Sequence, residues 1–68
     1  MTNRAGGEEE REVYFEFTAL GASVKVAAID ATTGIEVTVV GPASAARFDL
    51  QRLALAKLEA RLARRDGV

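Results

Sequence analysis

Apolar and polar residues alternate in three successive stretches of the chain, residues 12–18, 23–30 and 35–40. A period of two, built from β-branched and aromatic residues, is typical of strands that bury one face. The pattern therefore predicts three strands. Their expected inward-facing residues are Val13, Phe15 and Phe17 in the first strand, Val24, Val26 and Ala28 in the second, and Ile35, Val37 and Val39 in the third.

The turn between the second and third strands carries its own chemistry. Asp30 can accept hydrogen bonds from turn amides, and Gly34 can adopt the left-handed backbone that re-entry into a strand requires. A loop over residues 31–34 places Ala28 opposite Val37 and keeps all apolar partners on one face. We therefore expect an antiparallel hairpin in this register.

The turn between the first two strands is expected to work in the same way. A loop over residues 19–22 places Phe17 opposite Val24 on the apolar face. It also places Glu16 opposite Lys25 on the other face, which is a favourable cross-strand pair. Together the two hairpins predict a three-stranded antiparallel meander.

After Gly41-Pro42, which is expected to end the third strand, the apolar period becomes helical. The predicted fold is α+β, a β-β-β-α arrangement in which the C-terminal helix packs on one face of the meander. The chain of 68 residues is expected to form one domain over residues 11–65, after a disordered tail over residues 1–10. The predicted core is Val13, Phe15, Phe17, Val24, Val26, Val37, Val39, Phe48, Leu55, Leu58 and Leu62.

The amino-acid composition limits the reactions and binding sites that are expected of the chain. The chain has neither cysteine nor histidine, which removes disulfides, cysteine-bound metals and the commonest general base. The carboxylates of Glu12, Glu16 and Glu36 are expected on the solvent side of the sheet, where no pocket tunes their acidity. The sequence therefore predicts a protein that is not an enzyme, with no catalytic residues, no cofactor and no metal site.

No apolar run approaches the roughly 18 residues that a membrane helix needs, and no secretory signal is recognised, so a cytoplasmic protein with no membrane partner is expected. Charge is unevenly distributed along the chain. Residues 1–18 carry a net charge of −3, and residues 44–68 carry +3. The acidic start and basic end direct attention to the predicted helix as the surface for any anionic partner.

Four cations of this helix, Lys57, Arg61, Arg64 and Arg65, with Arg52 as a further candidate, could contact a phosphate backbone. Three strands followed by a helix also resemble the second half of a double-stranded-RNA-binding domain, although its first helix has no counterpart here. Weak nucleic-acid (RNA) binding is therefore one hypothesis. The alternative is that these cations only keep the helix solvated and complement its dipole.

Self-association is the second hypothesis for an interaction. Residues 35–40 form an exposed β-rich edge with no internal lysine or proline. The helix also has a second non-polar side, with Leu53, Ala56 and Ala60, where small residues permit close approach. We therefore expect a homodimer through one of these surfaces, in a non-enzymatic protein-interaction or structural module whose other protein partner is unknown.

Three strings of the chain, taken together, resemble a family of short uncharacterised alphaproteobacterial proteins, a domain of unknown function. These strings are REVYFEF at residues 11–17, SVKVAAIDATTGIEV at residues 23–37 and GPASAARFDLQRLALAKL at residues 41–58. The resemblance covers about residues 11–63. It implies no activity, cofactor or catalytic residue for any position.

Overall fold

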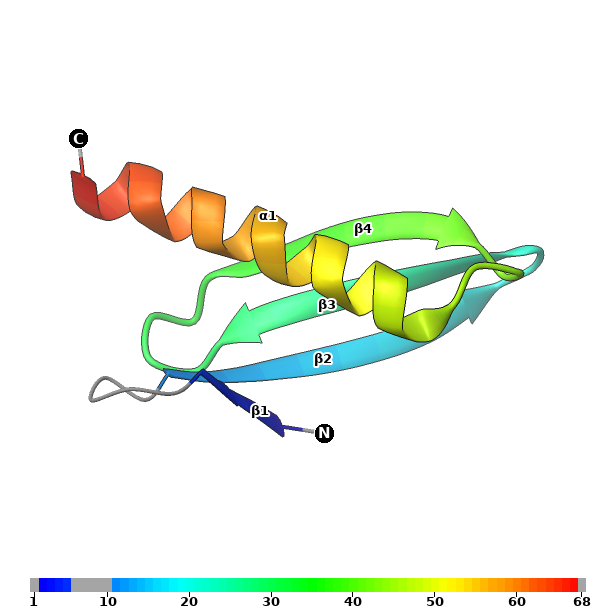
Figure 1. Ribbon diagram of the computed structural model, residues 1–68, viewed down its shortest axis with the longest axis horizontal. Coiled ribbons are helices and arrows are strands. Elements are labelled where there is room, and N and C mark those ends of the chain that lie inside the picture. The colour runs from blue at the N-terminus through cyan, green and yellow to red at the C-terminus, as the bar shows by residue number, and fades with distance from the viewer. Residues whose placement is uncertain (1, 6–10, 68) are drawn as a thin grey trace.

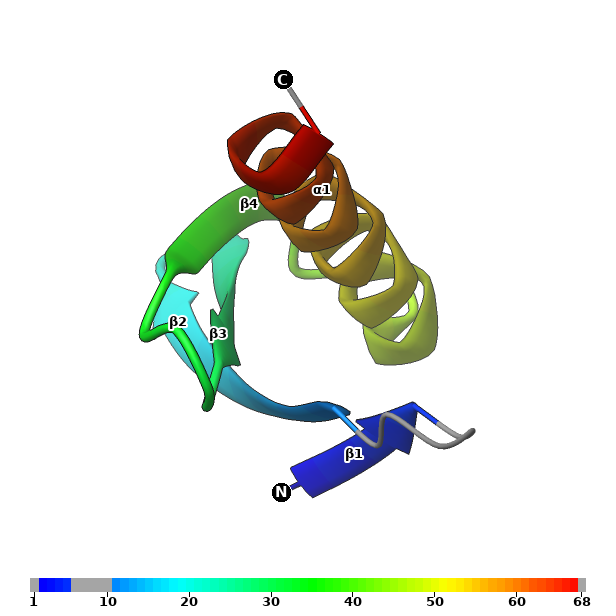
Figure 2. The same cartoon turned by 90° about the vertical axis from the view of Figure 1, so that its left-hand side faces the viewer.

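The computed structural model describes residues 2–5 and 11–67, with side chains for residues 11–65 (Figure 1). One antiparallel sheet has the strand order β1-β2-β3-β4, and helix α1 lies across one of its faces (Figure 2). The α+β class, with a meander followed by a C-terminal helix, is confirmed for β2, β3, β4 and α1. The elements are β1 Thr2–Ala5, β2 Arg11–Leu20, β3 Ser23–Asp30, β4 Glu36–Pro42 and α1 Arg47–Gly67.

The sheet has a strand that the sequence pattern does not predict. β1 pairs antiparallel with the start of β2, from Thr2 opposite Tyr14 to Ala5 opposite Arg11. The prediction of a disordered tail is thus wrong for residues 2–5, because a strand edge recruits backbone groups whatever the side chains are. Residue 1 and residues 6–10 of that tail lie outside the described residues.

The loop of the first hairpin is two residues shorter than expected. Phe17 lies opposite Val26 instead of Val24, and Thr18 instead of Glu16 lies opposite Lys25. The loop consists of Gly21 and Ala22. Gly21 has a positive φ of 61°, and no described residue other than glycine has a positive φ, so the φ of Ala22 is negative. A positive φ at the first loop position alone fits a type II′ turn. A two-residue shift preserves the faces, so apolar alternation could not reveal it.

The second hairpin has the predicted register. Val26 lies opposite Val39 and Ala28 lies opposite Val37. β4 continues beyond the expected end, however, because Pro42 still lies opposite Ser23. Proline is tolerated there because the last residue of an edge strand does not need to donate to a neighbour.

The core lies between α1 and the face of β2, β3 and β4 that alternation predicts. Phe48 is the wrong member of the predicted core, since 64% of it is exposed. Leu50 and Ala54 take its place, at 5% and 0% exposure. Buried residues four positions apart lie about 40° further around the helix at each step. The buried stripe therefore winds around α1, as an oblique crossing of the strands requires. The core cluster is Val13, Phe15, Val26, Ala28, Val37, Leu50, Ala54, Leu58 and Leu62, flanked by Phe17, Val24, Ile35, Val39, Ala45 and Leu55.

Gly41 sets how closely the first turn of α1 approaches β4. A Cβ atom added at Gly41 would lie 2.5 Å from Cδ2 of Leu50. Leu50 is buried, so its side chain has little room to move away. The glycine is therefore required by packing, whereas its φ would allow any residue.

We expect Gly41→Ala to lower the free energy of unfolding by about 1–3 kcal/mol, because the added methyl overpacks the contact with Leu50. Urea unfolding of the wild type, both single variants and the Gly41→Ala/Leu50→Ala pair measures this as a double-mutant cycle. In the Leu50→Ala background the glycine substitution should cost much less. Equal costs in both backgrounds would show that Leu50 does not impose the glycine.

Candidate protein-interaction surfaces

Asp30 anchors the turn between β3 and β4 from a fully buried position. Its Oδ2 accepts hydrogen bonds from the Thr33 amide at 2.9 Å and from the Thr33 hydroxyl at 2.7 Å. The same hydroxyl oxygen accepts from the Ile35 amide at 3.1 Å, and the Gly34 amide donates to the Asp30 carbonyl at 2.7 Å. These bonds fix the loop that sets the register of the hairpin.

The charge of this carboxylate is compensated from both ends of the chain. Nε of Arg11 lies 3.7 Å from Oδ1 of Asp30. Burial raises the pKa of Asp30, but the hydrogen bonds from Thr33 and the positive charges of Arg11 and Arg65 outweigh it, so the pKa is lowered overall. Among the described residues, Oδ2 is satisfied by the turn, and Oδ1 accepts no hydrogen bond but lies near the charge of Arg11. These contacts give the cluster a structural role in holding the turn.

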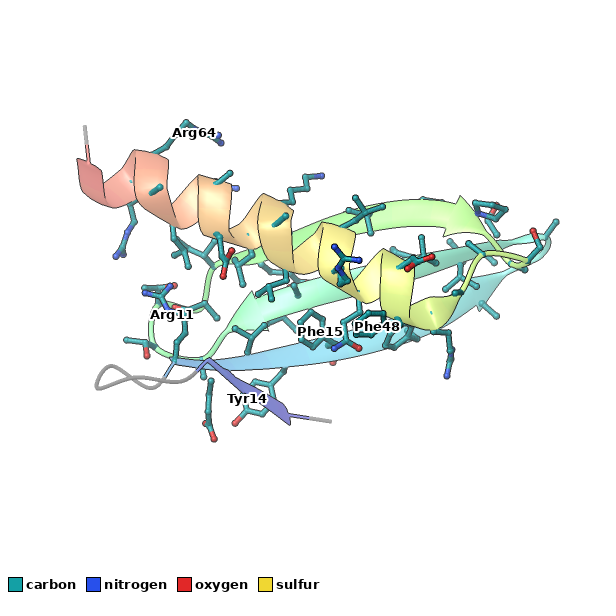
Figure 3. The ribbon with its side chains drawn as sticks, in the orientation of Figure 1. Arg11, Tyr14, Phe15, Phe48 and Arg64 are labelled. Carbon is teal, nitrogen blue, oxygen red and sulfur yellow. The ribbon has the colours of Figure 1, made fainter. Side chains whose placement is uncertain are left out.

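The predicted basic stripe is divided in the structure. Nζ of Lys57 donates to the backbone oxygen of Thr38 on β4 at 2.7 Å. Arg65 contributes to the electrostatic environment of Asp30. Arg61 and Arg64 are exposed, and Arg64 points away from the sheet (Figure 3). The four cations therefore do not form one continuous surface of equivalent groups.

The bond from Lys57 also changes the picture of the β4 edge. Backbone groups alternate in direction along a strand, and the Ile35 oxygen accepts from the Asp30 amide of β3. The Thr38 oxygen, three residues further along, therefore points away from β3 to the open edge. A lysine on an edge is a common device against strand addition, and here α1 supplies it.

The face of α1 that is turned away from the sheet carries Leu53, Ala56 and Ala60, as the sequence predicts. Leu53 is 59% exposed, and both alanines are exposed. A shallow depression of about 350 Å³ lies over Leu53 and Ala56, with Asp49 and Arg52 beside it. This surface, which we call the outer helix face, combines one large apolar side chain with small neighbours and charges of both signs.

A second surface, which sequence analysis missed, lies where the first turns of α1 meet the side of β2. The guanidinium of Arg47 lies 4.5 Å from the ring centre of Phe17, and that of Arg52 lies 5.8 Å from that of Phe48. We call these four residues the aromatic corner. The available signal was the spacing of Phe48 and Arg52, four residues apart on a helix, which permits a cation over a ring.

Within residues 2–5 and 11–67, no group of three or more aspartate, glutamate, cysteine or histidine side chains is placed to hold a metal ion. Within the same residues, α1 contains too few apolar residues to cross a membrane.

Comparison with known proteins identifies the family. The family model described as Domain of unknown function (DUF6898) matches residues 10–65. No curated protein and no solved structure gives a significant match. The chain belongs to this family of unknown function, and the match spans β2 to α1.

We expect stability to fall steeply in acid because of Asp30. A carboxylate whose pKa is lowered by folding stabilises the fold above its unfolded pKa, near 3.9, and loses that contribution as pH falls through this value toward the folded pKa. Asp30→Asn should lower the free energy of unfolding at neutral pH by about 1–3 kcal/mol and flatten the acid slope. Urea unfolding between pH 7 and pH 3 measures both effects.

The exposed carboxylate of Glu36 provides a matched control, and Glu36→Gln should keep the wild-type acid slope. An Asp30→Asn variant with the full wild-type slope would contradict the assignment.

Proposed function

We propose that the domain is a non-enzymatic protein-interaction module that forms a homodimer through the outer helix face. The observation that carries the proposal is the exposure of Leu53, at 59%, beside Ala56 and Ala60 on a long helix. A core of this size leaves little stability in reserve, and burial of a second apolar surface would add to it. A cytoplasmic location and an alphaproteobacterial origin belong to the proposal, as expectations from the sequence.

The residue order on the outer helix face is self-complementary. In an antiparallel pair of α1 helices with the two-fold axis at Ala56, Leu53 of one copy lies within one residue's rise, about 1.5 Å along the axis, of Ala60 of the other. A large side chain then lies over a small one, which allows the helices to approach closely. In the same arrangement Arg52 lies within one residue's rise of Glu59 of the second copy, which long side chains can span, so each interface contains two pairs of opposite charge. The sizes of the facing side chains and the signs of the facing charges therefore support the same alignment.

The other predicted route to a dimer, through residues 35–40, is weaker. Lys57 occupies the Thr38 oxygen, and pairing between two β4 edges would break that hydrogen bond in both copies. Val40 is 62% exposed on the strand, but its side chain belongs to the sheet face opposite α1. We therefore assign self-association to the helix.

We expect sedimentation equilibrium to show a mass that rises from 7.2 kDa toward twice that value with concentration. Arg52→Glu should raise the dissociation constant about tenfold or more, because two attractive pairs become repulsive. The double variant Arg52→Glu/Glu59→Arg should restore it. Arg61→Glu, on an exposed cation outside this alignment, is the matched control and should leave the dissociation constant unchanged. A mass of 7.2 kDa at every concentration would rule out the dimer.

Nucleic-acid binding remains the alternative function, and the exposure of Arg61 and Arg64 is what favours it. Lys57 donates a hydrogen bond to the Thr38 oxygen, and the charge of Arg65 acts on Asp30. We therefore expect no retention on heparin and no shift of a labelled RNA duplex, even at low salt, where phosphate contacts are strongest. Binding that disappears in Arg61→Glu/Arg64→Glu would favour the alternative.

A further inference from the structure

We propose that the open edge of β2 over Phe15–Leu20 binds an extended acidic peptide of a partner protein, which adds a strand antiparallel to β2. This inference goes beyond self-association and uses a different surface. It follows from three features of the described residues, namely an unpaired backbone edge, the aromatic corner and the arrangement of charge around them.

The first feature is the backbone of β2. The Ala31 amide donates to the Glu12 oxygen at 3.0 Å, so Glu12 and every second residue after it direct their backbone groups toward β3. Phe15, Phe17 and Ala19 direct theirs to the other edge. The register with β1 ends at Tyr14, so in the described part of the chain no strand pairs with these three residues. They offer a template for an added strand.

The second feature is what lies above this edge. α1 packs mainly on β3 and β4, and its first turn reaches the side of β2, so the aromatic corner flanks the edge on the helix side. Phe48 projects from the first turn of α1 and is 64% exposed (Figure 3). In an antiparallel ladder, residues directly opposite each other place their side chains on the same face. Peptide residues opposite Phe15 and Phe17 would therefore point toward the helix and the aromatic corner.

The third feature is charge. Arg47 and Arg52 are exposed, and neither forms an ion pair with another described residue. A guanidinium that stacks on a ring keeps its in-plane N–H donors free for a carboxylate. Glu16 carries a negative charge on the opposite face of β2. Acidic side chains are therefore favoured at the helix-facing positions of the peptide and disfavoured at the alternate ones.

The same charges argue against a second copy at this edge. Only residues that both direct their backbone outward can pair, so two β2 edges would meet with Phe17 at or beside the two-fold axis. The Arg47 side chains stacked on the two Phe17 rings would then approach each other as like charges. Arg47 would attract the carboxylates of an acidic strand at this edge, whereas it would repel the Arg47 side chain of a second copy.

The test uses the full chain and a short blocked peptide in which glutamate alternates with valine, matched in length to Phe15–Leu20. We expect protection from hydrogen exchange, measured by NMR, at the amides of Phe15, Phe17 and Ala19 when this peptide is added. Arg47→Glu should weaken peptide binding at least tenfold. A glutamate in the first turn of a helix favours the helix dipole, so this variant is expected to fold. Phe48→Ala, at an exposed position, should also weaken binding.

Arg64→Glu is the matched control, because Arg64 is also exposed and lies at the other end of α1. This variant should bind the peptide as the wild type does. A peptide in which lysine replaces glutamate should bind at least tenfold more weakly. Equal binding of both peptides, or binding without protection of the three amides, would overturn the proposal. Protection that appears with protein concentration in the absence of peptide would instead identify a second copy at this edge. None of these readouts involves Glu59, so loss of peptide binding and loss of the helix-mediated dimer are distinguishable.

Discussion

The packing of a single helix on a sheet of more than two strands constrains the whole molecule. A helix with its side chains is about 10–12 Å wide, and neighbouring strands lie about 4.8 Å apart, so one helix covers about two strands. α1 covers β3 and β4, with Gly41 allowing Leu50 to lie close to the sheet. β2 then depends on its own large side chains, Val13 and Phe15, to complete the core. The position of the helix also decides which strand edge is protected.

The two edges of the meander differ as a direct result. Above β4, α1 is close enough for Lys57 to bond the Thr38 oxygen. On the other side, among the described residues only the first four of β2 pair with β1, and the second half of β2 is flanked by Arg47 and Phe48 instead of being covered. An aromatic ring that is left exposed beside an unpaired edge lowers solubility unless it is occupied or shielded. The guanidiniums stacked on Phe17 and Phe48 provide partial shielding, and they give this side of the molecule its positive charge.

Local chemistry explains which parts of this arrangement the sequence predicts. The second hairpin follows correctly from Asp30 and Gly34, because specific hydrogen bonds fix its loop length. The first hairpin does not, because its faces are preserved by a two-residue shift and only the turn type at Gly21 distinguishes the registers. The helix was predicted as an element, but the angle at which it crosses the strands is a tertiary property, and that angle exchanges Phe48 for Leu50 in the core.

The candidate surfaces divide along the same line. The outer helix face was predicted because it follows from helical periodicity alone: residues opposite the buried stripe must face away from the sheet. The role of Lys57 at the β4 edge and the aromatic corner both depend on where α1 lies over the sheet, which no periodicity reports.

Arg52 links the two surfaces. Its guanidinium lies over the ring of Phe48, and its side chain also borders the depression beside Leu53. Arg47 has no such dual position, since it stacks on Phe17 at the β2 side. A contact between Arg52 and Glu59 of a second copy would draw the guanidinium away from Phe48 and uncover more of that ring. The proposed self-association on one side of the helix would therefore enlarge the apolar surface available on the other, while Arg47 would keep the positive charge that an acidic strand would meet.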